Sequence, residues 1–254
     1  MARLRKPFEQ KRVHAWRLLV TVAHMMSEIQ QRYQAVCERI TQAALQAGRP
    51  PAQVQLLAVS KTFAAEQVRE VAALGQRDFG ENYVQEGVDK IAALKDVHGL
   101  VWHCIGPLQS NKTRPVAEHF DWVHSVDRLK IAQRLSEQRP AHLPPLNICL
   151  QVNIDGGPTK AGVSPNDALA LAQAVSALPR LVLRGLMTIP DPVDGFDAQV
   201  AVHMQAKRLF DDLHASLELP QFDTLSMGMS ADLEAAVQAG STMVRVGTAV
   251  FGGR

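Results

Sequence analysis

Stretches of apolar residues alternate with amphipathic segments along most of this chain. Eight short apolar runs, each bounded by polar residues or glycine, predict eight buried β-strands. They cover residues 55–61, 78–82, 101–106, 122–126, 146–153, 181–188, 224–228 and 243–247. Apolar residues at helical spacing fill the intervals between these runs. A repeated strand–helix order of this kind is typical of α/β proteins with a parallel sheet.

A further helix is predicted ahead of the first strand, over residues 27–47. Ser27 and Gln30 form a capping box at its start, and Gly48 with the prolines that follow ends it. The sequence leaves no room for a helix after the eighth strand, so we expect this first helix to complete the outer ring. Predicted caps of later helices are Asp127, Ser164 and Ser230.

The eightfold alternation predicts a (β/α)₈ TIM barrel, a fold that routinely uses about 250 residues as one domain. An open, doubly wound sheet is the alternative. No G-x-G-x-x-G motif follows any predicted strand, which weakens a dinucleotide-binding interpretation. We therefore expect a single barrel domain over residues 26–254.

Residues 1–25 differ in kind from the rest. Six arginines and lysines but only one acid, Glu9, lie before residue 25. We interpret this segment as a basic extension that is disordered or precedes the native start at Met25 or Met26. A transit peptide remains the alternative.

Charge and cysteine content exclude several classes of protein. A formal net charge of +2 gives no reason to expect nucleic acid or a membrane surface as a partner. No apolar stretch approaches the roughly 20 residues of a spanning helix. Cys37, Cys104 and Cys149 are scattered and lack metal-ligand spacing. They predict reduced, buried thiols in a cytoplasmic protein without a metal site.

Lys61 ends the first apolar run. A lysine rarely closes such a run unless it is paired, functional or reaches solvent. In a barrel, functional side chains lie at the carboxyl ends of the strands. The later strand ends would bring Asn82, Met187 and Arg245 to the same mouth.

The last two strand ends have the composition of a phosphate site. Ser226, Gly228, Ser230, Gly247 and Thr248 offer hydroxyls and approachable backbone N–H groups. Barrels often hold phosphate after strands seven and eight, beside a helix N-terminus. The alternative is that these glycines only make tight turns.

Arg245 lies inside an apolar run, so it needs a partner. One possibility is an ion pair with Glu81 or another acid of the rim. The other is a ligand: a lysine, an arginine and a phosphate cradle at one mouth suit pyridoxal 5′-phosphate (PLP), with Lys61 forming a Schiff base and Arg245 facing the pyridine nitrogen. Arginine does not readily release a proton, so the ring would be a weak electron sink. His103 is interpreted as a core histidine with satisfied hydrogen bonds.

Several motifs together resemble the pyridoxal phosphate homeostasis protein family, from about Ser27 to the end of the chain. They are Ala58-Val59-Ser60-Lys61-Thr62, Phe79-Gly80-Glu81-Asn82-Tyr83-Val84-Gln85-Glu86, Trp102-His103-Cys104-Ile105-Gly106-Pro107-Leu108-Gln109-Ser110-Asn111-Lys112, Arg184-Gly185-Leu186-Met187, Ser226-Met227-Gly228-Met229-Ser230 and Val244-Arg245-Val246-Gly247-Thr248-Ala249-Val250-Phe251-Gly252. In one departure, Ala231 stands where the resemblance leads us to expect an acid, which leaves Asp232 as the only acid of that pair.

The resemblance implies a barrel of the alanine racemase-like class with PLP on Lys61, phosphate around Ser226, Gly247 and Thr248, and Arg245 near the ring nitrogen. Asn82, Met187 and Gly228 are further candidate contacts. It also implies a role in intracellular vitamin B6 balance without a catalytic reaction, with PLP-dependent apo-enzymes as possible recipients. No catalytic residue is assigned.

Two other functions remain open. An amino-acid racemase of the same class would need an opposite-face base, and the only tyrosines are Tyr33 and Tyr83. The racemases' second, dimerising domain does not follow in this sequence, which favours a monomer. A Schiff-base aldolase acting on a sugar phosphate would also need a lysine and a phosphate site.

Overall fold

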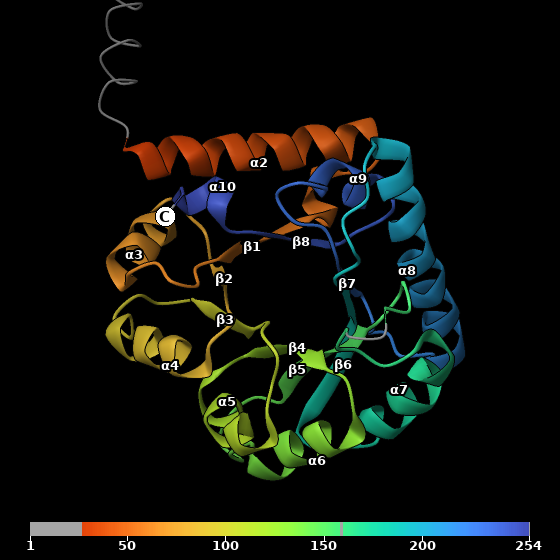
Figure 1. Cartoon of the computed structure of the whole chain (residues 1–254). Coiled ribbons are helices and arrows are strands. Elements are labelled where there is room, and N and C mark those ends of the chain that lie inside the picture. The colour runs from red at the N-terminus through yellow and green to blue at the C-terminus, as the bar shows by residue number, and fades with distance from the viewer. Residues whose placement is uncertain (1–26, 158–159, 254) are drawn as a thin grey trace, which may run out of the picture.

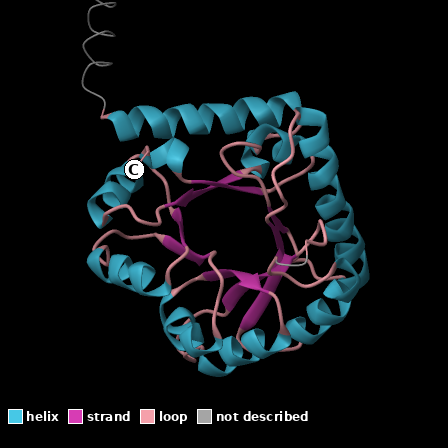
Figure 2. Cartoon of the chain, viewed as in Figure 1, coloured by secondary structure: helices cyan, strands magenta, loops and turns pink. Residues whose placement is uncertain are grey.

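A computed structural model describes residues 27–157 and 160–253. The predicted basic extension, residues 1–25, lies outside the described residues. Within them, the chain forms one closed barrel surrounded by helices (Figures 1 and 2). No helix among them is both long and apolar enough to cross a membrane.

Eight parallel strands close in sequence order, each bonded to its neighbours and β8 to β1. Their bounds are β1 Gln55–Val59, β2 Asp78–Glu81, β3 Val101–Cys104, β4 Trp122–Val126, β5 Leu146–Val152, β6 Leu181–Thr188, β7 Thr224–Ser226 and β8 Met243–Val246. The predicted (β/α)₈ barrel is thus confirmed over the open, doubly wound sheet.

Helices cover the outside of the barrel (Figure 2). Their bounds are α2 Glu28–Gln46, α3 Ala65–Ala73, α4 Val84–Ala93, α5 Thr113–His119, α6 Leu129–Gln138, α7 Ala168–Ser176, α8 Phe196–Leu217, α9 Leu233–Gln238 and α10 Thr248–Phe251. Short 3₁₀ turns cover Pro51–Gln53, Ser110–Lys112 and Pro165–Asp167.

Helix α2 closes the ring where the first and last strands meet. It packs against α9, α10 and α3 (Figure 1). The Ser27 hydroxyl accepts a hydrogen bond from the Gln30 N–H at 3.1 Å, so the predicted cap is confirmed. The expectation that no helix follows the eighth strand was wrong, because the one-turn helix α10 fits between β8 and the end of the chain.

Side chains alternate between the barrel interior and the layer under the helices, as strand geometry requires. On β1, Leu57 and Val59 pack inward with Ile105 and Met243, whereas Leu56 and Ala58 join the main core beneath the helices. A second interior cluster holds Trp122, Cys149 and Met187 on the far wall. Buried polar side chains, among them His103, His124 and Arg245, belong to the same interior.

Several predicted boundaries differ from the structure; β1 and β3, for example, each end two residues before the predicted limit, at Val59 and Cys104. Strand β7 ends at Ser226 and not at Gly228. Asp127 does not cap α6, since Arg128 occupies the cap position and pairs with the Asp127 carboxylate at 2.6 Å. Ser164 is confirmed as a cap, and accepts from the Asp167 N–H at 3.2 Å, but the turn that follows is 3₁₀ before α7 begins.

Candidate functional site

A cavity of about 470 Å³ opens at the carboxyl ends of the strands. It brings together five of the predicted site residues, Lys61, Asn82, Arg245, Gly247 and Thr248. Its apolar wall consists of Val59, Phe63, Ile105, Ile189 and Met229. A mostly apolar cavity with a few converging polar groups is typical of a small-molecule site.

Lys61 follows β1 directly and faces this cavity. Its side chain is half-buried, and its amine makes no hydrogen bond or ion pair with any residue that the structure describes. The next residue, Thr62, has a φ of 67°, which is costly for a residue other than glycine. A lysine held on a strained turn without a partner is free to bind a ligand.

A buried ionic cluster braces this turn from the helix side. Lys90 of α4 donates to the Ser60 carbonyl at 2.6 Å and to Glu81 Oε1 at 2.8 Å. It also donates to Glu86 Oε1 at 2.7 Å, and that carboxylate accepts from the Thr62 N–H. The cluster therefore holds the residues on both sides of Lys61.

Arg245 lies at the floor of the cavity and is only 5% exposed. Its Nη1 donates to the Ser226 carbonyl at 2.7 Å and to Ser226 Oγ at 2.9 Å, and its Nη2 donates to the Thr188 carbonyl at 2.9 Å. Burial lowers the pKa of Arg245 to about 10, so it remains charged at neutral pH.

The alternative of an ion pair between Arg245 and Glu81 was wrong. Glu81 points to the helix side of β2, where its Oε1 accepts from Lys90 and from the Ser60 hydroxyl. The partners of Arg245 are instead two backbone carbonyls and one hydroxyl. This leaves a buried positive charge beside the cavity.

Asn82 carries a buried side-chain oxygen, Oδ1, that lacks a hydrogen-bond partner among the described residues. Buried polar atoms in native proteins nearly always have a partner. Because Asn82 also lines the cavity, its oxygen is placed to accept a hydrogen bond from a ligand or a water molecule.

Ser230, Gly247 and Thr248 form the rim of the cavity between β7, β8 and α10. The predicted capping role of Ser230 was wrong: α9 begins at Leu233, and the carboxylate of Asp232 accepts from the Met229 N–H at 2.6 Å. Asp232 occupies the cap position of α9, but its carboxylate binds the turn before the helix and makes no cap hydrogen bond to it. Ser230 still lies at the rim.

Three other predicted residues are not among the described residues that line the cavity. Met187 packs with Trp122 and Cys149 in the barrel interior. Ser226 lies beneath Arg245, and Gly228 adopts a φ of 89° next to α9. Their contact with a ligand stays a prediction.

Sequence reasoning missed the apolar wall and the residues that brace the polar ones. Ile105 belongs to a predicted strand. Side chains alternate with a period of two along a strand, and this rule, counted from His103, would have placed Ile105 on the inner face. The i,i+4 spacing of Glu86 and Lys90 was the local signal for their pair. The other partners of Lys90, Ser60 and Glu81, lie outside its helix and had no local signal. His103 is confirmed as a satisfied core histidine, with both ring nitrogens hydrogen-bonded. The described residues contain no group of three or more side chains arranged to hold a metal ion.

Comparison with known proteins identifies the class of this barrel. The family model described as "Alanine racemase, N-terminal domain" matches residues 32–254. Alanine racemase from Corynebacterium glutamicum shares the fold with a TM-score of 0.61 at 18% identity, and this chain covers 60% of its length.

Relatives of higher sequence identity identify the family within this class. The pyridoxal phosphate homeostasis protein of Pseudomonas aeruginosa is 60% identical over 229 residues, which are 90% of this chain and 97% of that protein. Its counterpart in Escherichia coli K12 is 53% identical over 90% of this chain and 98% of that protein. This chain belongs to the family of pyridoxal phosphate homeostasis proteins.

A solved relative was determined with and without ligand. PipY of Synechococcus elongatus, with PLP bound, is 41% identical with a TM-score of 0.74, over 85% of this chain and all of PipY. The structure of PipY without PLP matches with a TM-score of 0.75 at 42% identity, over 85% of this chain and 99% of PipY.

Proposed function

We propose that this protein binds PLP, holds it as a Schiff base on Lys61 and serves in intracellular PLP homeostasis. The observation that carries the proposal is the convergence of an unpartnered lysine amine, the buried Arg245 guanidinium and an unsatisfied Asn82 oxygen on one cavity. The PLP-bound relative PipY supports the same ligand.

The residues of the cavity fit this cofactor. When bound, PLP supplies an aldehyde that reacts with an amine and a ring that withdraws electrons. Lys61 supplies the amine. Arg245, fixed by three hydrogen bonds, would donate toward the ring nitrogen, and the apolar wall would exclude water from the ring.

The phosphate end is assigned to the rim. Ser230 and Thr248 carry hydroxyls, and the first N–H groups of α10 lack partners within the helix. We keep Ser226, Gly228 and Met187 in the proposed site as contacts of the cofactor, Gly247 at its phosphate end, and Asn82 as a hydrogen-bond acceptor.

We propose that this site binds without turnover. Racemisation by two bases needs a proton carrier on each face of the substrate. Apart from Lys61, the described residues lining the cavity include no histidine, carboxylic acid, cysteine or tyrosine that could serve as the second base. Tyr33 is hydrogen-bonded to Gln76 outside the barrel, and Tyr83 is exposed beyond the cavity lining. Incubation with L-alanine tests this, since formation of D-alanine at ordinary enzyme rates would support the racemase alternative.

An absorption spectrum tests the binding proposal. Protein mixed with PLP and freed of excess ligand should be yellow, and Lys61→Ala should be colourless. Lys160→Ala is the matched control, because Lys160 donates to the carbonyl of Ile189 at the cavity wall but is ion-paired with Asp155 and Asp191. A colourless wild type that takes up no PLP would reject the proposal and favour the aldolase alternative.

Location and partners belong to the same proposal. Cys37, Cys104 and Cys149 are all free thiols, which is typical of cytoplasmic proteins. PLP-dependent apo-enzymes are the proposed recipients, and the proposed state is a monomer. Light scattering after size-exclusion chromatography will measure the mass, and a dimer would contradict the monomer.

A further inference from the structure

A chain of hydrogen-bonded side chains crosses the barrel from its amino-terminal face to the cavity. Asp78 Oδ1 lies 3.0 Å from His103 Nε2, and His103 Nδ1 lies 2.9 Å from His124 Nε2. His124 Nδ1 lies 3.1 Å from Ser226 Oγ, which accepts from Arg245 at 2.9 Å. Only Asp78, at 17% exposure, reaches solvent; the other four are buried.

For neutral imidazole rings, the carboxylate at one end fixes the direction of every hydrogen bond in this chain. Arginine only donates and a carboxylate only accepts. Neutral His103 must donate through Nε2 to Asp78, and so it accepts at Nδ1. His124 must then donate through Nε2 and accept at Nδ1, which requires the Ser226 hydroxyl to donate to it.

His124 is held neutral by its surroundings. Burial lowers the pKa of His124 well below its ordinary value, and the charge of Arg245 lowers it further. His103 stacks on Trp122 at 5.2 Å between ring centroids, which holds its plane. Each polar atom of both rings has a partner, as a buried network requires.

We propose that His103 and His124 are positioning residues for Arg245, and that Asp78 sets their direction from the opposite face of the barrel. Because the Ser226 proton points to His124, the lone pairs of Ser226 Oγ remain free to accept from Arg245. The guanidinium is thereby held toward the cavity floor.

Reversing the chain would weaken that hold. A donor in place of Asp78 would make His103 and His124 each carry their proton on Nδ1. Ser226 Oγ would then accept from both His124 and Arg245, and the hydrogen of the Ser226 hydroxyl would no longer take part in this series of hydrogen bonds. The affinity for PLP should therefore respond to a substitution on the far side of the barrel; this part rests on the proposed function.

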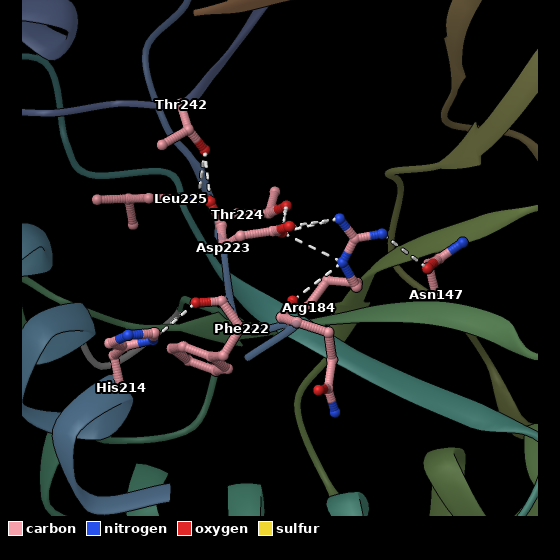
Figure 3. Close-up of polar contacts among 9 residues, drawn as sticks. Asn147, Arg184, His214, Phe222, Asp223, Thr224, Leu225 and Thr242 are labelled. Atoms are coloured by element: carbon pink, nitrogen blue, oxygen red, sulfur yellow. Dashed lines mark hydrogen bonds and ion pairs between the residues drawn. The ribbon is translucent and has the colours of Figure 1, made fainter. Parts of the chain in front are cut away.

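The test substitutes Asp78→Lys, a side chain that only donates. Asp223→Lys is the control: Asp223 lies on the same face and pairs with Arg184 at 2.7 Å, outside the chain (Figure 3). Ring ¹⁵N spectra of the ligand-free proteins show which nitrogen of each histidine carries the proton. Affinity is then measured by titration with PLP.

Wild type should show both His103 and His124 protonated on Nε2 alone at neutral pH. Asp78→Lys should move both protons to Nδ1 and weaken PLP binding about fivefold or more relative to Asp223→Lys, a typical coupling between distant sites. An Nδ1 proton or a doubly protonated ring in the wild type would overturn the proposal even if the variant fails to fold.

Unchanged tautomers in Asp78→Lys, or affinity equal to that of Asp223→Lys, would also overturn it. The ring spectra need no PLP, so they separate a failure of this inference from a failure of PLP binding itself. If the wild type takes up no PLP yet shows the expected tautomers and their reversal, the hydrogen-bonded chain stands and the proposed function fails.

Discussion

Replacing Lys90 by methionine removes the cation that neutralises the carboxylates beneath the Lys61 turn. Lys90 is 6% exposed and its partner Glu81 is fully buried. Methionine keeps the length of the side chain but leaves the Glu81 carboxylate with the Ser60 hydroxyl as its remaining donor. Removing one partner of a buried ion pair costs about 3–5 kcal/mol. We expect a loss of that size in the free energy of unfolding at about pH 8.

The loss should shrink in acid. Burial raises the pKa of Glu81, while hydrogen bonds from Lys90 and Ser60 act against that rise. Without Lys90 the folded-state pKa rises further above the unfolded value. The folded state then binds a proton before the unfolded state does as pH falls, so acid restores part of the stability. The double variant Glu81→Gln/Lys90→Met leaves no charge in this pair. It should recover most of the lost stability at all pH values.

Urea unfolding of the ligand-free protein at about pH 8 and about pH 5.5 measures both effects. Arg114→Met is the control, because Arg114 and Glu118 form an exposed ion pair at 3.7 Å with the i,i+4 spacing of Lys90 and Glu86. Exposed pairs contribute about 0–1 kcal/mol. A loss below about 1 kcal/mol for Lys90→Met at pH 8, or equal losses at both pH values, would refute the reasoning.

Two further substitutions test the surroundings of the site. A Cβ on Gly106 would lie 2.1 Å from the Asn82 carbonyl oxygen. In thermal unfolding, Gly106→Ala should therefore lower the stability by about 1–3 kcal/mol, and in PLP titration it should weaken binding. Gly253→Ala, with open space around Gly253, should change neither stability nor binding. Burial raises the pKa of Asp232, but hydrogen bonds, chiefly from His203, outweigh burial and hold it below its ordinary value. The contribution of the Asp232 carboxylate to stability is therefore complete above the unfolded-state pKa of about 3.9, and it is lost as pH falls through the folded-state pKa. In urea unfolding, Asp232→Asn should be less stable than wild type near pH 7 by about 1.5–3 kcal/mol, and a gap that stays constant down to about pH 3 would contradict this.

The order of elements could be predicted because each strand of this barrel is buried on both faces. That burial requires the apolar runs seen at Leu56–Val59 and at Met243–Val246, and strand–helix alternation leaves few other topologies. Capping positions were predicted less well. Asp127 and Ser230 have the right chemistry for a cap, but Asp127 pairs with its neighbour, and Asp232 accepts the N–H at the turn after β7.

The site was predictable where a residue's position in its strand decides its direction. Lys61 and Arg245 lie on inner-facing positions and do line the cavity. The same alternation would have placed Glu81 on the outer face, away from Arg245. The partners of Glu81 and Arg245 could not be predicted, because Lys90 and Thr188 approach them only through the folded barrel.

The bond to Lys61 is the central claim, and chemical trapping tests it directly. PLP-treated protein is reduced with borohydride, digested and analysed by mass spectrometry. We predict a stable PLP adduct on the peptide that contains Lys61, at close to one per chain, with no adduct in Lys61→Ala and an unchanged yield in Lys160→Ala. An adduct that persists in Lys61→Ala, or one distributed over several lysines of the wild type, would contradict the account.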